Sequence, residues 1–333
     1  MIRRIPGALR QFFATESAGG VILVVAAVGA LIFANSPIHQ GYADFWRPSQ
    51  DFINEGLMSI FFFLVGLEIK REFIHGELRN PRAAALPILS AIGGMITPAL
   101  IFLLINHGGS GARGWAVPMP TDIALSLGAL ALLGDRINVS VKIFLLTLAI
   151  TDDLGSIIVL GIFYSNGISP LKILSTIGAV LLAWVIPNGK KFSLDRMIEL
   201  IHPWSSYLII PLFALVNIGL RIDFSSLASL ISSPISVGIL MGRIVGKIIG
   251  ITLFAWLALK IGVAKLPETL SMKEIAGAGA LAGMGLTVSL FIAELALSNE
   301  EQLSQVKVSL ILSAIVSALI GLAWLRKFSP GKS

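Results

Sequence analysis

The chain has 333 residues, of which 55% are hydrophobic and only 13% are charged, whereas soluble domains carry about 25% charged residues. Together with repeated apolar runs of about 20 residues, the length that spans a bilayer, this composition excludes a soluble globular protein. The net charge of +6 is explained by cytoplasmic loops rather than by nucleic-acid binding, and the absence of cysteine excludes disulfides and thiolate metal sites.

The apolar runs, taken in chain order, predict an all-α polytopic membrane protein with about ten transmembrane helices. The first run has the full length of a span, so we interpret it as a retained helix rather than a cleaved signal peptide. The ten helices are expected near residues 19–36, 53–72, 83–106, 116–133, 142–164, 171–188, 202–220, 234–260, 275–297 and 305–325.

The distribution of lysine and arginine predicts which side of the membrane each loop faces. With the N-terminus inside, 18 of the 25 basic residues fall on the cytoplasmic side and five fall outside. The remaining two, Arg243 and Lys247, lie within an apolar run. Because basic residues gather in cytoplasmic loops, this asymmetry favours an even number of spans with both termini in the cytoplasm.

Ionisable side chains stand near the predicted middle of the membrane, where each costs roughly 2.5–3.5 kcal/mol. They are Asp122, Asp152, Asp153, Arg243 and Lys247. At about 1.5 Å per residue, Asp122, Asp152 and Lys247 all lie roughly 20 Å from their nearest cytoplasmic turns, so they can neutralise one another. A structural ion pair could hold helices together, but a third carboxylate is unnecessary for packing.

Two of the predicted helices contain residues that interrupt a helix. In the fourth helix Pro118 and Pro120, which lack amide donors, precede Asp122, and the ninth helix contains glycines at 277, 279, 283 and 285. Paired interruptions in the two halves of a transporter mark its binding site. We therefore expect spans 3–5 and 8–10 to form an inverted-topology repeat whose two broken helices cross at mid-membrane.

Six stretches thread nearly the whole chain in order. They are FFFLVGLEIKREFIHGEL (61–78), TDIALSLGALALLG (121–134), LAITDDLGSIIVLGIFY (148–164), HPWSSYLIIPLFALVN (202–217), GKIIGITLFAWLALK (246–260) and GLTVSLFIAELA (285–296). At these residues the sequence resembles the NhaA family of bacterial sodium–proton antiporters. The resemblance implies a multi-pass transporter of the bacterial cell inner membrane, not an enzyme. It would exchange cytoplasmic Na⁺ (or Li⁺) for external H⁺ by alternating access, regulated by pH and without a cofactor.

The resemblance also implies roles for the buried residues. Asp152 and Asp153 match the family's essential aspartate pair, at which Na⁺ binds, and Asp153 is the better candidate for a direct ligand. Thr121 and Asp122 match the extended part of the first broken helix, and Lys247 matches the lysine that pairs with Asp152. Because adjacent helix positions point about 100° apart, the two aspartates can face different partners.

Four charged residues of the second helix match positions that the family associates with the cytoplasmic funnel and the response to pH. They are Glu55, Glu68, Arg71 and Glu72. Charged side chains that snorkel to an interface are the alternative interpretation of these four. His75 and His202 can titrate near neutrality, but we expect each to lie in a loop or at a helix end without a dedicated role.

Exchange at an aspartate site requires a carboxylate that both protons and Na⁺ can occupy at the working pH. A carboxyl group with an ordinary pKa of about 3.9 is almost never protonated at pH 7.5, and burial is one way to favour the neutral acid. We therefore expect protons and Na⁺ to compete for the aspartates. The Thr121 hydroxyl and carbonyl groups of an unwound segment could supply further oxygens to Na⁺.

The chain departs from the family in three places. Between Ser165 and His202 it has one predicted span where the family usually has three, and residues 37–52 lack the long outer hairpin that supports a homodimer. Arg243 stands where we expect an apolar residue, and it would repel Na⁺ if it faced the site. We predict four regions: N-terminal scaffold helices (1–82), a first ion-binding core repeat (83–165), a reduced scaffold (166–233) and a second core repeat (234–333).

Three alternatives stay open. The main one is an inactive or repurposed antiporter homologue that lacks two scaffold helices. An intramembrane aspartyl protease would need aspartates on facing helices in Tyr-Asp and Gly-x-Gly-Asp settings, which this chain lacks at Asp122, Asp152 and Asp153. A passive cation channel would not need a closely placed lysine, and its ion flux would ignore the proton gradient.

Overall fold

The computed structural model describes residues 7–164, 170–187, 193–221 and 227–329, and every regular element within them is a helix. This confirms the predicted all-α class. The α-helices are α1 (Gly7–Ala34), α2 (His39–Trp46), α3 (Met58–His75), α4 (Pro81–Ile105), α5 (Ile123–Ala131), α6 (Val139–Phe163), α7 (Pro170–Val185), α8 (Leu194–Trp204), α9 (Ile210–Ile218), α10 (Leu227–Ser232), α11 (Pro234–Met241), α12 (Lys247–Lys260), α13 (Met272–Leu281), α14 (Thr287–Ala296) and α15 (Glu300–Phe328).

Seven helical runs in the described part of the chain are long and apolar enough to cross a membrane. They are Phe12–Ala34, Phe52–His75, Pro81–Ile105, Val139–Phe163, Leu194–Ile218, Pro234–Lys260 and Glu300–Phe328. Three of these runs include a π-helical segment: η2 (Phe52–Leu57), η6 (Ser205–Ile209) and η7 (Gly242–Gly246). The other three predicted spans are two interrupted helices and α7, whose described apolar part is short. The count of ten and the inverted repeat therefore stay predictions.

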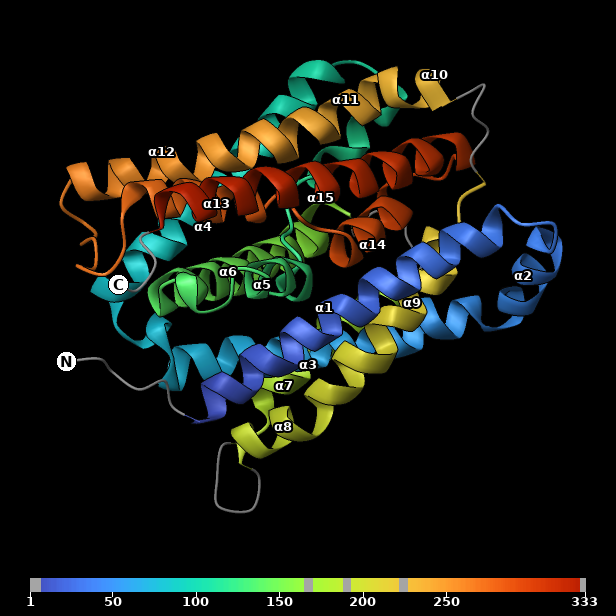
Figure 1. The fold of residues 1–333 in the computed structure, drawn as a ribbon. Helices are drawn as coiled ribbons and strands as arrows, with labels where there is room; N and C mark the ends of the chain where they lie inside the picture. Colours follow the sequence, from blue (N-terminus) through green and yellow to red (C-terminus); the bar gives the residue numbers. More distant parts are fainter. Residues whose placement is uncertain (1–6, 165–169, 188–192, 222–226, 330–333) are drawn as a thin grey trace.

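The helices form two groups, with α5 and α6 between them (Figure 1). In one group α4 packs against α12, and both α11 and α13 pack against α15. In the other group α1 packs against α9, and α3 packs against α7 and α8. The start of α1 and the end of α15 lie toward the same end of the bundle (Figure 1). The division of the chain into four regions stays a prediction. The cytoplasmic position of both termini also stays a prediction.

Local sequence determines where two of the helices begin. The Asn80 side chain accepts a hydrogen bond from the amide of Arg82 at 3.1 Å, and Pro81 occupies the first position of α4, where its missing amide proton is not needed. At the start of α13, Ser271 and Glu274 form a reciprocal capping box. Both caps satisfy amide groups that have no partner within the helix.

The contact between α4 and α12 depends on two facing glycines. A Cβ atom at Gly250 would lie 2.1 Å from the carbonyl oxygen of Gly93, and one at Gly93 would lie 2.3 Å from that of Gly250. We predict that Gly250→Ala lowers the free energy of unfolding by about 1–3 kcal/mol, measured by thermal unfolding in detergent. The matched control is Gly178→Ala in α7, where no described atom outside the local helix backbone lies within 4 Å of the added carbon. Equal losses in the two variants would contradict this packing.

Candidate functional site

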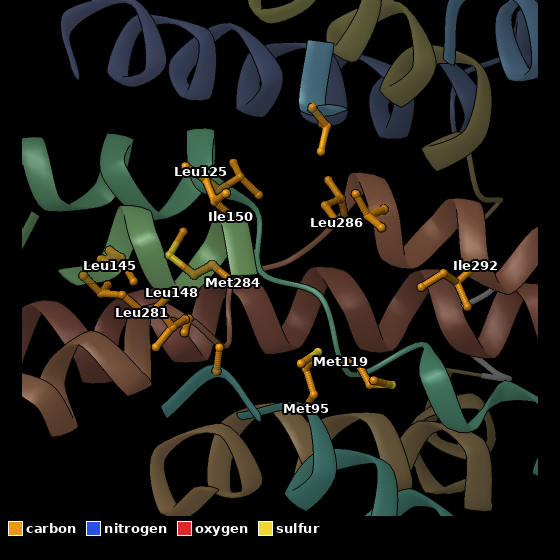
Figure 2. Packing of buried hydrophobic residues seen from close by; sticks show 14 of the residues in the cluster. Met95, Met119, Leu125, Leu145, Leu148, Ile150, Leu281, Met284, Leu286 and Ile292 are labelled. Atoms are coloured by element: carbon orange, nitrogen blue, oxygen red, sulfur yellow. The ribbon is translucent and has the colours of Figure 1, made fainter. Parts of the chain in front are cut away.

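The two interrupted helices meet at their non-helical segments. The first interruption, residues 117–122, follows η4 (Ser110–Ala116) and precedes α5, and the second, residues 282–286, separates α13 from α14. The amide of Asp122 donates to the carbonyl oxygen of Met284 at 2.8 Å. Buried apolar side chains from both segments, including Met119 and Met284, belong to one hydrophobic cluster (Figure 2). Pro118, Pro120, Gly283 and Gly285 therefore lie in the two interruptions, which the structure brings together, whereas Gly277 and Gly279 lie within α13.

Asp122 joins the starts of two helices. Its Oδ1 accepts from the amide of Leu125 at 3.1 Å, as an N-cap of α5, and its Oδ2 accepts from the hydroxyl of Thr287 at 2.9 Å, in the first turn of α14. A carboxylate is stabilised at a helix start because the amide groups there carry partial positive charge. Asp122 thus occupies a position where the starts of both helices favour a negative charge.

Asp152, Lys247 and Thr121 form a buried network from three segments. The Nζ of Lys247 donates to Oδ2 of Asp152 and to Oγ1 of Thr121, each at 2.9 Å. Thr121 also contacts Asp152 directly, with its hydroxyl 2.5 Å from Oδ2 and its amide 3.2 Å from Oδ1. The side chains of Asp152 and Lys247 are fully buried, so each charge depends on the other for compensation.

Asp153 faces a different environment from its neighbour. Its side chain lines a cavity of about 40 Å³, and its Oδ1 is buried with no hydrogen-bond partner among the described residues. Thr121, Asp122 and Glu68 line the same cavity. A water molecule needs roughly 10–15 Å³ of cavity volume. The cavity is therefore large enough to hold a small hydrated ion beside the Asp153 carboxylate.

A buried acid–histidine cluster also lines this cavity. The Nε2 of His202 lies 2.6 Å from Oε1 of Glu16 and 3.8 Å from Oε1 of Glu68, and all three side chains line the cavity. His202 also lines a second cavity of about 100 Å³ together with Arg71. Our expectation that His202 lies at a helix end without a dedicated role is wrong about its position, because α8 continues through η6 into α9 and the side chain is buried.

The other residues of the second predicted helix are spread along it. Glu72 is buried one turn beyond Glu68 and accepts from the Thr147 hydroxyl at 3.4 Å, and the Arg71 guanidinium stacks 5.3 Å from the ring centroid of Phe12. Glu55 lies in η2, 13 residues before Glu68, which corresponds to about 20 Å along a helix. The structure therefore places Glu68 at the cavity and leaves Glu55 away from it. His75 is exposed at the end of α3.

Three features of the site were not predicted from the sequence: Glu16, Thr287 and the buried position of His202. Glu16 lies near the start of the first apolar run, Phe12–Ala34, and a carboxylate within that run was the available signal. Thr287 directly follows the second interruption, where a short hydroxyl side chain can reach the opposite segment. Neither feature predicts which residue the side chain contacts. Glu16 contacts His202 and Thr287 contacts Asp122, and the residues of each pair are more than 160 positions apart in the sequence.

The chain is similar to known proteins over nearly its whole length. The sequence model of the family described as Na⁺/H⁺ antiporter 1 matches residues 10–187 and 172–325. Proteins named Na⁺/H⁺ antiporter NhaA from Shewanella sp. (strain ANA-3) and Escherichia coli O6:H1 (strain CFT073) are each 38% identical to this chain. The alignments cover 98% and 96% of this chain and 99% and 97% of the relatives. The first runs over 386 positions, so the relative has residues without a counterpart in this chain of 333.

Proposed function

This chain belongs to the Na⁺/H⁺ antiporter 1 family, and on that premise we propose that it exchanges cytoplasmic Na⁺ (or Li⁺) for external H⁺ across a bacterial inner membrane. The observation that carries the proposal is the Asp153 carboxylate, whose Oδ1 has no hydrogen-bond partner in the described structure and which faces a buried cavity. Its neighbour Asp152 is already neutralised by Lys247. An isolated buried charge is costly, so Asp153 favours an occupant, either a proton or a small cation.

Competition between these two occupants couples their movement in the proposed mechanism. When Na⁺ binds Asp153, with Asp152 nearby, the proton must leave, and when a proton returns, Na⁺ must leave. Thr121 and Asp122 line the same cavity and offer further oxygens. Among the residues that the structure describes, no group of three or more acidic, histidine or cysteine side chains could by itself hold a metal ion, so water would complete the shell of a transported ion.

The second cavity provides a route for the proposed cytoplasmic access. His202 lines both cavities and contacts Glu16 and Glu68, so this cluster stands between the route and Asp153. We assign the proposed response to pH to Glu68, Arg71 and Glu72, which follow the same face of α3. Glu55 does not belong to this route, because it lies in η2 toward the opposite end of that helical run.

Alternating access would involve relative movement of the two helix groups. The cavity beside Asp153 is lined by Glu16 of α1, by Glu68 of α3 and by Thr287 of α14, and α14 packs against α15. We propose that the group containing α4, α12 and α13 moves against the group containing α1, α3 and α9. Residues 37–52 form α2 and a short 3₁₀ turn, so any homodimer would lack a long outer hairpin.

Everted membrane vesicles from a bacterium without its own sodium–proton antiporters test the proposed function. Vesicles that contain this protein should lose a preformed proton gradient when Na⁺ or Li⁺ is added, and vesicles without it should not. Host growth in high Na⁺ should also be restored. No response to either ion would favour the inactive or repurposed homologue, and Na⁺ flux that ignores the proton gradient would indicate a channel.

A further inference from the structure

Arg243 is a fully buried cation that the proposed exchange does not use. It projects from η7 into the contact between the two interrupted helices. Its guanidinium donates to the carbonyl oxygens of Val117 at 3.3 Å, Pro120 at 3.1 Å and Gly283 at 3.0 Å. It also donates to the hydroxyl of Ser289. One side chain therefore bonds to both non-helical segments and to α14.

The carbonyl groups that Arg243 binds are among those that the interruptions release. Gly283 follows the end of α13 and Val117 follows the end of η4, and carbonyl groups at helix ends carry partial negative charge. Two other released carbonyls are also occupied, since Ala282 accepts from the Thr121 hydroxyl and Met284 accepts from the amide of Asp122. Each of these carbonyl groups therefore has one lone pair engaged and could offer only the other to Na⁺, so our expectation that unwound carbonyls supply oxygens to Na⁺ stays a prediction.

The space for the guanidinium is provided by a glycine. A Cβ atom at Gly285 would lie 2.4 Å from Nη1 of Arg243 and 2.5 Å from the carbonyl oxygen of Pro120. Any other residue at this position would displace either the guanidinium or the backbone that it binds. The site is therefore built for this side chain, and Arg243 does not merely fill a gap between helices.

We infer that Arg243 is a positioning residue that holds the two interruptions together and, as a fixed positive charge, weakens the binding of Na⁺ at the aspartates. This inference rests on the proposed function, because it concerns the affinity of that site. Arg243 interacts electrostatically with Asp122 and Asp152 and with the ammonium group of Lys247. Hydrogen bonds fix the guanidinium to carbonyl groups, so it cannot move away when a cation enters the cavity.

The balance of charge gives the direction of the effect. Asp122, Asp152 and Asp153, when ionised, together with Lys247 and Arg243 leave one negative charge. A neutral residue at position 243 would leave two net negative charges, which attract a cation more strongly than one. At an effective dielectric constant of about 20, a unit charge at roughly 10 Å changes the binding free energy of a cation by about 1.7 kcal/mol, or more than tenfold, so a threefold change in affinity is a lower limit.

The test compares Arg243→Gln with Arg243→Lys in everted vesicles, with the wild-type protein alongside. Glutamine keeps two amide donors for the carbonyl groups but removes the charge, whereas lysine keeps the charge with fewer well-placed donors. The apparent KM for Na⁺ is measured from neutral to alkaline pH, and its plateau at high pH is compared. We expect Arg243→Gln to lower the plateau KM by roughly threefold or more. Arg243→Lys should keep the plateau KM within about twofold of the wild-type value. Both variants should lower the maximal rate.

Equal plateau KM values in the two variants would overturn the inference, because a purely structural role does not distinguish charge from neutrality. If neither variant accumulates in the membrane, Ser289→Ala replaces them, because it removes one acceptor and leaves the charge. It should keep the plateau KM within about twofold of the wild-type value, and a threefold or larger change would contradict the fixed-charge role. Failure of the wild-type protein to exchange Na⁺ for H⁺ would instead overturn the proposed function.

Discussion

Asp153→Asn should abolish Na⁺-driven proton movement in everted vesicles. Asparagine has nearly the same shape as aspartate, but it cannot carry a negative charge or release a proton at physiological pH. Removing a unit charge about 4 Å from a bound cation, at an effective dielectric constant of about 20, weakens binding by about 4 kcal/mol, or on the order of a thousandfold. The rate should therefore fall below detection at Na⁺ concentrations that saturate the wild-type protein.

The control for this variant is Asp44→Asn. Asp44 lies in α2, where its exposed carboxylate pairs with Arg47 at 3.1 Å, and exposed pairs contribute about 0–1 kcal/mol. Its replacement should leave transport unchanged. Na⁺-driven proton movement that survives in Asp153→Asn at the wild-type rate would show that another group exchanges the ions.

Lys247→Met should destabilise the protein and also disrupt transport. Methionine replaces the ammonium group with an apolar end of similar length, which leaves the fully buried Asp152 without its positive partner. Removing one member of a buried ion pair typically costs about 3–5 kcal/mol. We expect a loss of this size in the free energy of unfolding, measured by thermal unfolding in detergent.

A second substitution distinguishes the loss of stability caused by breaking the ion pair from the loss caused by altered packing. Adding Asp152→Asn to Lys247→Met removes the uncompensated charge, so part of the stability should return while transport stays absent. Lys265→Ala, at an exposed position in the loop after α12, should leave stability unchanged. If the single and double variants were equally unstable, Asp152 and Lys247 would not depend on each other as the structure indicates.

Much of the fold could be predicted from the sequence, because long apolar runs and helix-interrupting residues act locally. Pro118 and Pro120 cannot donate backbone hydrogen bonds, and the structure interrupts the helix there. The runs that became single long helices were the easiest to recognise. The helix expected near residues 171–188 corresponds to α7 (Pro170–Val185). The π-helical segments η2, η6 and η7 could not be predicted, because they insert a wider turn into an otherwise regular helix and have no simple sequence pattern.

The site could be predicted only in part. Asp122, Asp152, Asp153 and Lys247 were visible as charges within apolar runs, since such charges are expensive unless they serve a purpose. Their hydrogen-bond partners were not visible, because Thr287 and Glu16 reach the site from distant parts of the chain. Arg243 was predicted to be unfavourable to Na⁺ if it faced the site. Its carbonyl partners depend on how two segments cross, which a linear pattern does not specify.

The affinity of the purified protein for Na⁺ at pH 6 and at pH 8.5 tests most directly whether protons and Na⁺ compete for the aspartates. Each competing proton should raise the apparent Kd for Na⁺ by up to about tenfold per pH unit in the range where the carboxylates titrate. We predict binding that is weaker at pH 6 by about tenfold or more, with proton release on Na⁺ binding. Equal affinity at the two pH values, with no proton released, would contradict the account.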